Sequence, residues 1–182
     1  MTNISISEEI ATACPDLHVL VLSCDVCNSE PDERLWQEIA DEEKAVRETV
    51  KLEQINKWLP IQATRQAYKR LGKDPNRYRP SSEALRRRIL RGLPLYKVDT
   101  LVDLINLVSI RSGYSIGGFD ADKIAGGSLV LGVGREGEIY HGIGRGELNI
   151  AGLPVYRDAV GGVGTPTSDE ERTKIGLDST HL

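Results

Sequence analysis

The 182-residue chain has few of the residues that build metal centres, disulfide frameworks and nucleophilic active sites. It contains three histidines and three cysteines, Cys14, Cys24 and Cys27. The cysteines are too few and too clustered for a disulfide framework, which indicates a reducing compartment. Cys24 and Cys27 form one Cys-x-x-Cys, but a zinc site needs two further ligands. We therefore expect neither a metal nor another cofactor.

Long apolar runs and the common catalytic motifs are also missing. No run approaches the ~20 apolar residues of a membrane span, and residues 1–13 lack a secretory pattern, so we expect a cytoplasmic protein without a membrane partner. The sequence has no Gly-x-Ser-x-Gly elbow. No helical pattern follows the glycine clusters 142–146 and 161–164, which excludes a dinucleotide fingerprint and favours hairpin turns and close backbone approaches.

The patterns that are present predict a single α+β domain over residues 1–182, with helices packed on a mostly antiparallel sheet. Apolar residues at helical spacing, with caps and stops, predict helices around 35–40, over 55–71 with a break at Pro60, over 81–91 and over 100–112. In the last helix Leu101, Leu104, Ile105 and Val108 are expected to face inward. Short apolar runs predict strands at 17–22, 129–131, 138–140, 153–156 and 173–177, of which 17–22 should be buried.

Positive charge is concentrated in residues 64–97, although the formal net charge of the chain is −4. This stretch carries eleven Lys or Arg against Asp74 and Glu83, a local balance of +9. Arginine predominates, and its planar guanidinium pairs with phosphate in a fork. The predicted nucleic-acid-binding residues are Arg65, Lys69, Arg70, Arg77, Arg79, Arg86, Arg87, Arg88 and Arg91. The alternative is that these side chains form solvated helix faces, some of them paired with the acidic amino-terminal third.

Asp178 and Thr180 are the candidate catalytic residues. They stand two positions apart, so on a strand both side chains would point to the same face and could line one pocket. The alternative is a strand-end turn in which the side chains cap backbone groups.

Several motifs between Arg79 and Thr180 resemble the B3/B4 editing domain of the phenylalanyl-tRNA synthetase beta subunit, in the form of the free-standing B3/B4 proteins. Asp103-Leu104-Ile105-Asn106 resembles the Asp-x-x-Asn helix of that family, and the segment from Phe119 to Ile124 resembles its Phe-Asp-x-Asp-Lys-Ile turn. Residues 79–85 and 168–173 are similar to further pieces of the free-standing members. Residues 79–180 carry the resemblance, and residues 1–60 match only loosely.

The resemblance implies an α+β fold with a sheet-lined pocket, and hydrolysis of the ester of mischarged tRNA. It places Gly161, Gly162, Asn106 and Phe119 among the substrate-binding residues. It also makes Asp178-Ser179-Thr180 similar to the acid-x-Thr of the archaeal and eukaryotic editing pocket. Two departures stand out. Gly117 replaces the editing histidine of the bacterial pattern, and Val163 replaces its editing glutamate.

These observations support a module that binds tRNA or aminoacyl-tRNA, with trans-editing hydrolysis of mischarged esters as its possible reaction. Backbone amides near Gly161 and Gly162 would then stabilise charge at the ester carbonyl. The loss of the histidine and the glutamate favours the alternative, a non-catalytic module that binds an amino acid or tRNA. A third hypothesis is a protein-interaction domain whose arginines bind an acidic partner.

Overall fold

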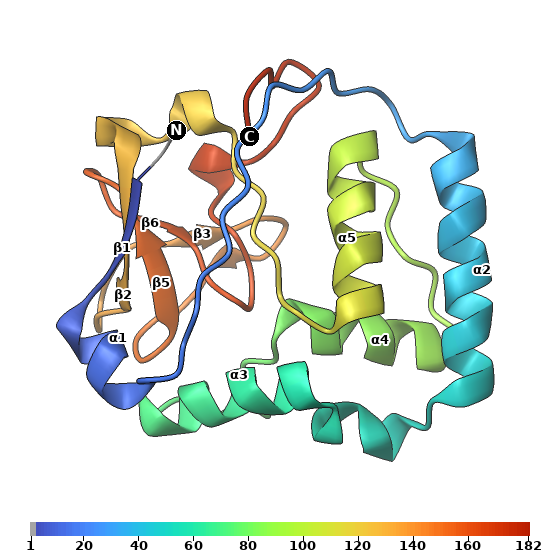
Figure 1. Cartoon of the computed structure of the whole chain (residues 1–182), viewed down its shortest axis with the longest axis horizontal. Coiled ribbons are helices and arrows are strands. Elements are labelled where there is room, and N and C mark those ends of the chain that lie inside the picture. Colours follow the sequence, from blue (N-terminus) through green and yellow to red (C-terminus); the bar gives the residue numbers. More distant parts are fainter. Residues whose placement is uncertain (1–2) are drawn as a thin grey trace.

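A four-stranded sheet and a group of helices lie side by side in the computed structural model, which describes residues 3–182 (Figure 1). The strand order is β1-β2-β5-β6, with bounds Asn3–Ile6, Ser128–Val133, Pro154–Arg157 and Gly162–Gly164. β1 pairs with β2 in parallel, and the other two pairings are antiparallel. The predicted α+β fold with a mostly antiparallel sheet is therefore confirmed.

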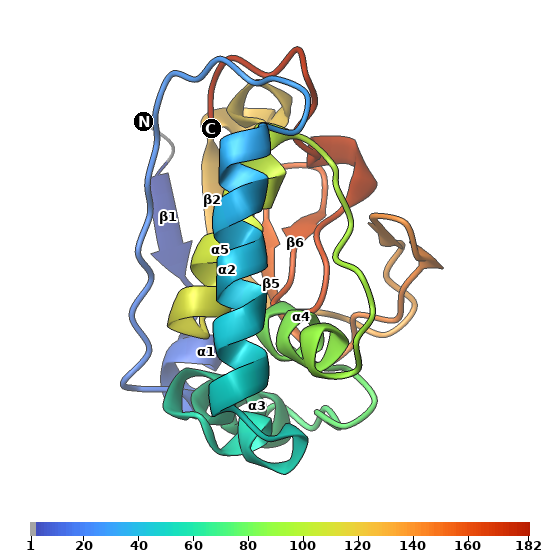
Figure 2. The same cartoon turned by 90° about the vertical axis from the view of Figure 1, so that its right-hand side faces the viewer.

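Beside the sheet, α2 (Glu33–Thr49) covers α5 (Thr100–Ser112) (Figure 2). Both pack against α4 (Ser81–Leu90). The remaining helices are α1 (Glu8–Ala13), α3 (Leu59–Arg70) and the 3-10 helices η1 (Leu52–Lys57), η2 (Ala121–Lys123), η3 (Ala125–Gly127) and η4 (Glu171–Thr173). None of the helices described has the length and apolar content needed to cross a membrane.

Local sequence signals set several helix ends. The side chains of Asp32 and Asp99 accept hydrogen bonds from the third residue of α2 and α5, which satisfies one free backbone donor at each start. α5 ends at Gly113, whose φ of 79° is the left-handed conformation that glycine adopts at least cost. The predicted 55–71 helix is divided near Pro60 into η1 and α3, and Pro60 lies in the first turn of α3, where a missing backbone N–H costs little.

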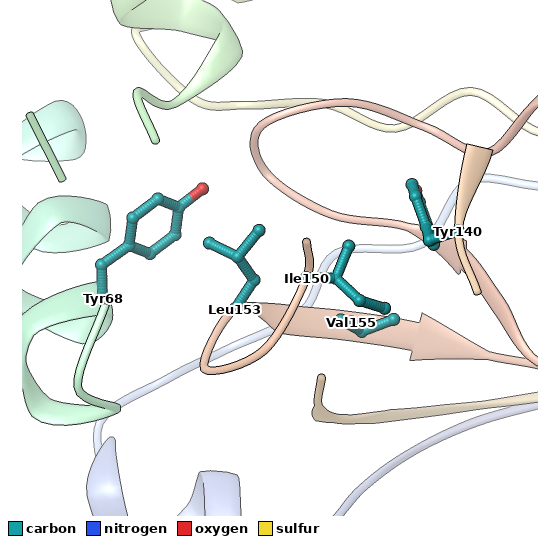
Figure 3. Close-up of a cluster of buried hydrophobic side chains, with 5 residues drawn as sticks. All are labelled: Tyr68, Tyr140, Ile150, Leu153 and Val155. Atoms are coloured by element: carbon teal, nitrogen blue, oxygen red, sulfur yellow. The ribbon is translucent and has the colours of Figure 1, made fainter. Parts of the chain in front are cut away.

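A buried cluster joins α3 to the sheet (Figure 3). Tyr68 of α3 packs there with Leu153 and Val155 at β5, and with Tyr140 and Ile150. The Tyr68 hydroxyl lies 2.9 Å from the Thr167 hydroxyl, so its polar end is satisfied inside the protein. Tyr68 therefore has a structural role.

The predicted buried strand at 17–22 is wrong. The segment forms no strand, and the side chains of Leu20 and Leu22 are 87% and 81% exposed. Residues 3–6 take the edge of the sheet beside β2, which leaves no edge for 17–22 there. The chain instead continues to Cys24, whose backbone exchanges two 3.0 Å hydrogen bonds with Leu182. Cys24 and Cys27 are exposed free thiols, and no cluster of three metal-ligating residues occurs within residues 3–182.

Other corrections concern the inward face of α5 and two predicted strands. Leu104 and Val108 are exposed, whereas Asp103, Leu107 and Ile110 are buried, because α5 faces both α2 and α4. Residues 138–140 and 173–177 form no strand; the first leads into the hairpin of β3 (His141–Gly142) and β4 (Gly146–Glu147), and the second follows η4. The hairpin itself confirms the turn predicted for the glycine cluster 142–146.

Candidate nucleic-acid interface

A groove of about 860 Å³ opens between α4, the loop 91–98 that follows it, and the tip of the β3–β4 hairpin. α2 and α5 contribute apolar side chains to it, among them Ile39, Leu107 and Ile110. Six arginines line it: Arg77, Arg79, Arg87, Arg88, Arg91 and Arg145. We call this feature the arginine groove.

Most of these arginines have no internal counter-charge. Within residues 3–182, no carboxylate lies within 4.0 Å of the guanidinium nitrogens of five of them, Arg77, Arg79, Arg88, Arg91 and Arg145. The single acidic residue in the lining described is Asp103. Its carboxylate accepts hydrogen bonds from Trp36 Nε1 at 2.6 Å and from the Val98 amide at 3.1 Å, and burial raises its pKa. Positive charge therefore dominates the groove.

Two aromatic side chains accompany the arginines. The guanidinium of Arg88 lies over the Tyr96 ring, 4.1 Å from its centroid, and donates to the Pro94 carbonyl. The Lys97 ammonium lies 4.8 Å from the centroid of the Trp36 ring. Because these two contacts hold Arg88, it presents a preformed cationic surface beside an exposed aromatic ring.

Three of the predicted nucleic-acid-binding arginines have largely buried side chains that make internal contacts. Arg86 is buried, donates to the Ile110 carbonyl and stacks 3.5 Å from the Trp58 ring centroid, and burial lowers its pKa to about 10. Arg65 and Arg87 both pair with the fully buried Glu83, at 2.9 and 2.7 Å. Arg65 and Arg86 therefore do not line the groove, whereas Arg87 is anchored in its wall.

The remaining predicted cations, Lys69 and Arg70, are exposed on α3 outside the lining of the groove. Arg70 donates to the Ala13 carbonyl at 3.2 Å. The basic stretch therefore divides between two surfaces, and α4 with its flanking loops holds the denser one.

The residues predicted from the resemblance are distributed over three places. Asn106 lines the arginine groove. Phe119 lies edge-on to Tyr156 with ring centroids 6.2 Å apart, and its ring occupies the space that a side chain at position 164 would need. The Gly161 amide donates to Asp158 Oδ1 at 3.0 Å, so this predicted donor already has an acceptor, and Gly162 stands at the start of β6 against the Tyr140 ring.

Asp178 lies in a turn and Thr180 in the irregular segment after it, so neither is on a strand. Ser179 between them is buried and donates to Asp120 Oδ2 at 2.7 Å. Asp178 is exposed, and no hydrogen bond within residues 3–182 connects Asp178 or Thr180 with Gly161 or Gly162. The prediction that the four residues share a pocket stays a prediction, without a contact that supports it.

Asp169 is an acid that the sequence did not indicate. Its carboxyl accepts one hydrogen bond, from the Gly118 amide at 3.3 Å, and lies against the backbone of Gly117 and Gly164. A Cβ at Gly117 would stand 3.3 Å from Asp169 Oδ1, and one at Gly164 would stand 2.8 Å from it. Burial raises the pKa of Asp169 to about 7. The group therefore titrates near neutral pH inside a glycine-walled site.

Sequence reasoning missed three residues of the groove: Arg145, Tyr96 and Trp36. Arg145 is a single cation within a glycine-rich turn, far from the basic stretch, so charge density could not identify it. Tyr96 follows the arginines of α4 closely and could have been found from its position among basic residues. Trp36 could be recognised only as one of the apolar residues at helical spacing, which indicates packing and not binding.

A family model described as the B3/4 domain matches residues 63–182. The match includes α4, α5, the hairpin and the sheet strands from β2 onward. The arginine groove lies within it, apart from the two α2 residues Trp36 and Ile39. Comparison of the chain with curated proteins and with solved structures found no match.

Proposed function

The chain belongs to the B3/4 domain family, and on this premise we propose that it binds tRNA through the arginine groove. The domain is associated with tRNA binding and editing in phenylalanyl-tRNA synthetase beta subunits. The observation that carries the proposal is the set of five arginines without a carboxylate partner around one concave surface. Like charges around one groove repel one another, and an anionic nucleic-acid backbone relieves that repulsion while it releases its own counterions. A cytoplasmic location is part of the same proposal.

A charge-matched pair of triple variants tests this function. Arg77, Arg79 and Arg91 are exposed and lack carboxylate partners, so their joint replacement by alanine should leave the fold intact. We expect this variant to bind tRNA about tenfold or more weakly, and the slope of log affinity against log salt to fall by about 2 to 3. Filter binding or fluorescence anisotropy at several salt concentrations measures both quantities.

The control removes the same number of charges away from the groove. Arg34, Lys44 and Arg135 are exposed cations on other surfaces, and we expect their joint replacement by alanine to have little effect on binding. Equal losses in the two variants would show that tRNA responds only to overall charge and would overturn the proposed interface.

Ester hydrolysis of mischarged tRNA is a second proposal, favoured by one observation. The Asp178 carboxylate is exposed and has no cationic partner within residues 3–182, so it is free to bind the ammonium group of an aminoacyl ester. A proton relay through the His181 ring would need Thr180 on one ring nitrogen and Asp122 on the other. Both Thr180 Oγ1, at 3.2 Å, and Asp122 Oδ2, at 2.8 Å, contact the same nitrogen, Nδ1, so these three residues do not form such a relay. Thr180 would therefore not act as an activated nucleophile, and a bound water molecule would attack the ester directly.

The Asp178→Ala and Thr180→Val variants test the second proposal. If Asp178 holds the substrate ammonium, its replacement should slow deacylation of mischarged tRNA by about 10- to 100-fold and leave tRNA binding unchanged. Release of the amino acid is followed over time, together with the melting temperature. A wild-type protein without deacylation, or variants that lose stability but not activity, would assign the chain to the non-catalytic binding modules.

A further inference from the structure

The arginine groove contains features that a double helix would not use. Exposed apolar side chains from the loop after α4, Leu93 and Val98, line it together with the buried Leu107 and Ile110. A duplex presents its phosphates and sugars outward and keeps its bases stacked inside, so it offers nothing apolar to such a lining. Unpaired bases have free apolar faces.

Tyr96 is the most exposed aromatic side chain of the groove, with 69% of its surface accessible. Arg88 covers one face of its ring, and no hydrogen bond within residues 3–182 holds its hydroxyl group. A tyrosine that is neither buried nor hydrogen-bonded, with a guanidinium on one face, leaves the other face open to a planar group. Base stacking on such a ring is a common mode of single-strand binding.

Arginines surround this apolar and aromatic centre. Arg77 and Arg79 come from the loop before α4, Arg91 comes from its end, and Arg145 comes from the hairpin opposite. A chain that passes through the groove therefore meets cations on more than one side. Its backbone phosphates can contact them while a base lies against Tyr96.

We infer that the arginine groove binds an unpaired stretch of RNA, with a base stacked on Tyr96 and the phosphates on the surrounding arginines. This inference rests on the proposed function and specifies which form of nucleic acid the groove takes. The apolar lining, the open ring face of Tyr96 and the convergent arginines all favour a single strand over a duplex. An acidic peptide would pair with the arginines but would leave the ring and the lining without a partner.

The experiment compares an unstructured RNA oligonucleotide with the same strand annealed to its complement, using the full chain and fluorescence anisotropy. We expect the unpaired strand to bind more tightly. The Tyr96→Ala variant should weaken binding of the unpaired strand by about 5- to 100-fold and leave duplex binding unchanged. Tyr114, which is 62% exposed outside the groove, provides the matched control Tyr114→Ala, for which we expect no change.

The possible outcomes separate this inference from the proposed function. If duplex and unpaired RNA bind equally, or if Tyr96→Ala weakens both alike, the inference is wrong, while binding that still depends on Arg77, Arg79 and Arg91 retains the proposed function. If neither RNA binds and an oligoglutamate peptide does, both are wrong and the groove is a protein-interaction site. If nothing binds, both are wrong as well.

Discussion

Replacement of Glu83 by glutamine is expected to lower the free energy of unfolding by about 2 to 4 kcal/mol. Glu83 is fully buried, and its two carboxylate oxygens contact Arg65 at 2.9 Å and Arg87 at 2.7 Å. The side chains of these arginines are themselves only 12% and 18% exposed. A neutral amide would leave two poorly solvated guanidinium groups without a counter-charge, which is costlier than the loss of an exposed ion pair.

The control for Glu83 is a surface ion pair of the same type. Glu48 lies 4.0 Å from Lys44 on α2, and both side chains are exposed. Glu48→Gln should therefore change the free energy of unfolding by less than about 0.5 kcal/mol. Urea or thermal unfolding measures both variants. A loss for Glu83→Gln as small as that of the control would show that Arg65 and Arg87 do not need the carboxylate.

Glu83 also connects stability to the proposed interface. Arg87 lines the arginine groove, and its pairing with Glu83 fixes it on α4. The structure thus divides the basic stretch into arginines that neutralise a buried acid and arginines that remain available to an external anion. For this reason the tests of RNA binding leave Arg86 and Arg87 unchanged.

The second large effect is expected at Asp169, and it depends on pH. Burial raises the pKa of this carboxyl to about 7 in the folded protein, whereas an unfolded chain has an aspartate pKa near 3.9. Between about pH 4 and pH 7 the folded state holds a proton that the unfolded state has released. Stability from this group therefore decreases as pH rises through that window, by about 2 to 4 kcal/mol in total.

The Asp169→Asn variant removes this titration. Compared with the wild type, we expect the variant to be more stable at pH 8 by about 2 to 4 kcal/mol, and to lose most of that advantage at pH 5. Burial, and to a smaller extent the Asp169 charge, raises the pKa values of Tyr140 and Tyr156, so both side chains stay neutral throughout the window. Unfolding is measured across the pH range, with Asp16→Asn as an exposed control. A difference between Asp169→Asn and the wild type that does not vary with pH would contradict the prediction.

The sequence by itself determined the features that depend on neighbouring residues. The start of α5 at Asp99 and its stop at Gly113 could be predicted, because a helix end is satisfied by groups within a few positions of the chain. The concentration of arginine in 64–97 and the motifs of the B3/B4 resemblance are likewise properties of the linear chain.

Only the tertiary structure decided which arginines are available to an external ligand and which apolar residues are buried. Arg86 and Arg91 look alike in the sequence, but Arg86 is buried on Trp58 and Arg91 faces the groove. The apolar run 17–22 has the composition of a buried strand but forms none, and its residues Leu20 and Leu22 are exposed, because its place at the sheet edge belongs to β1. Burial and pairing depend on partners distant in the sequence, and one linear pattern is compatible with several such arrangements.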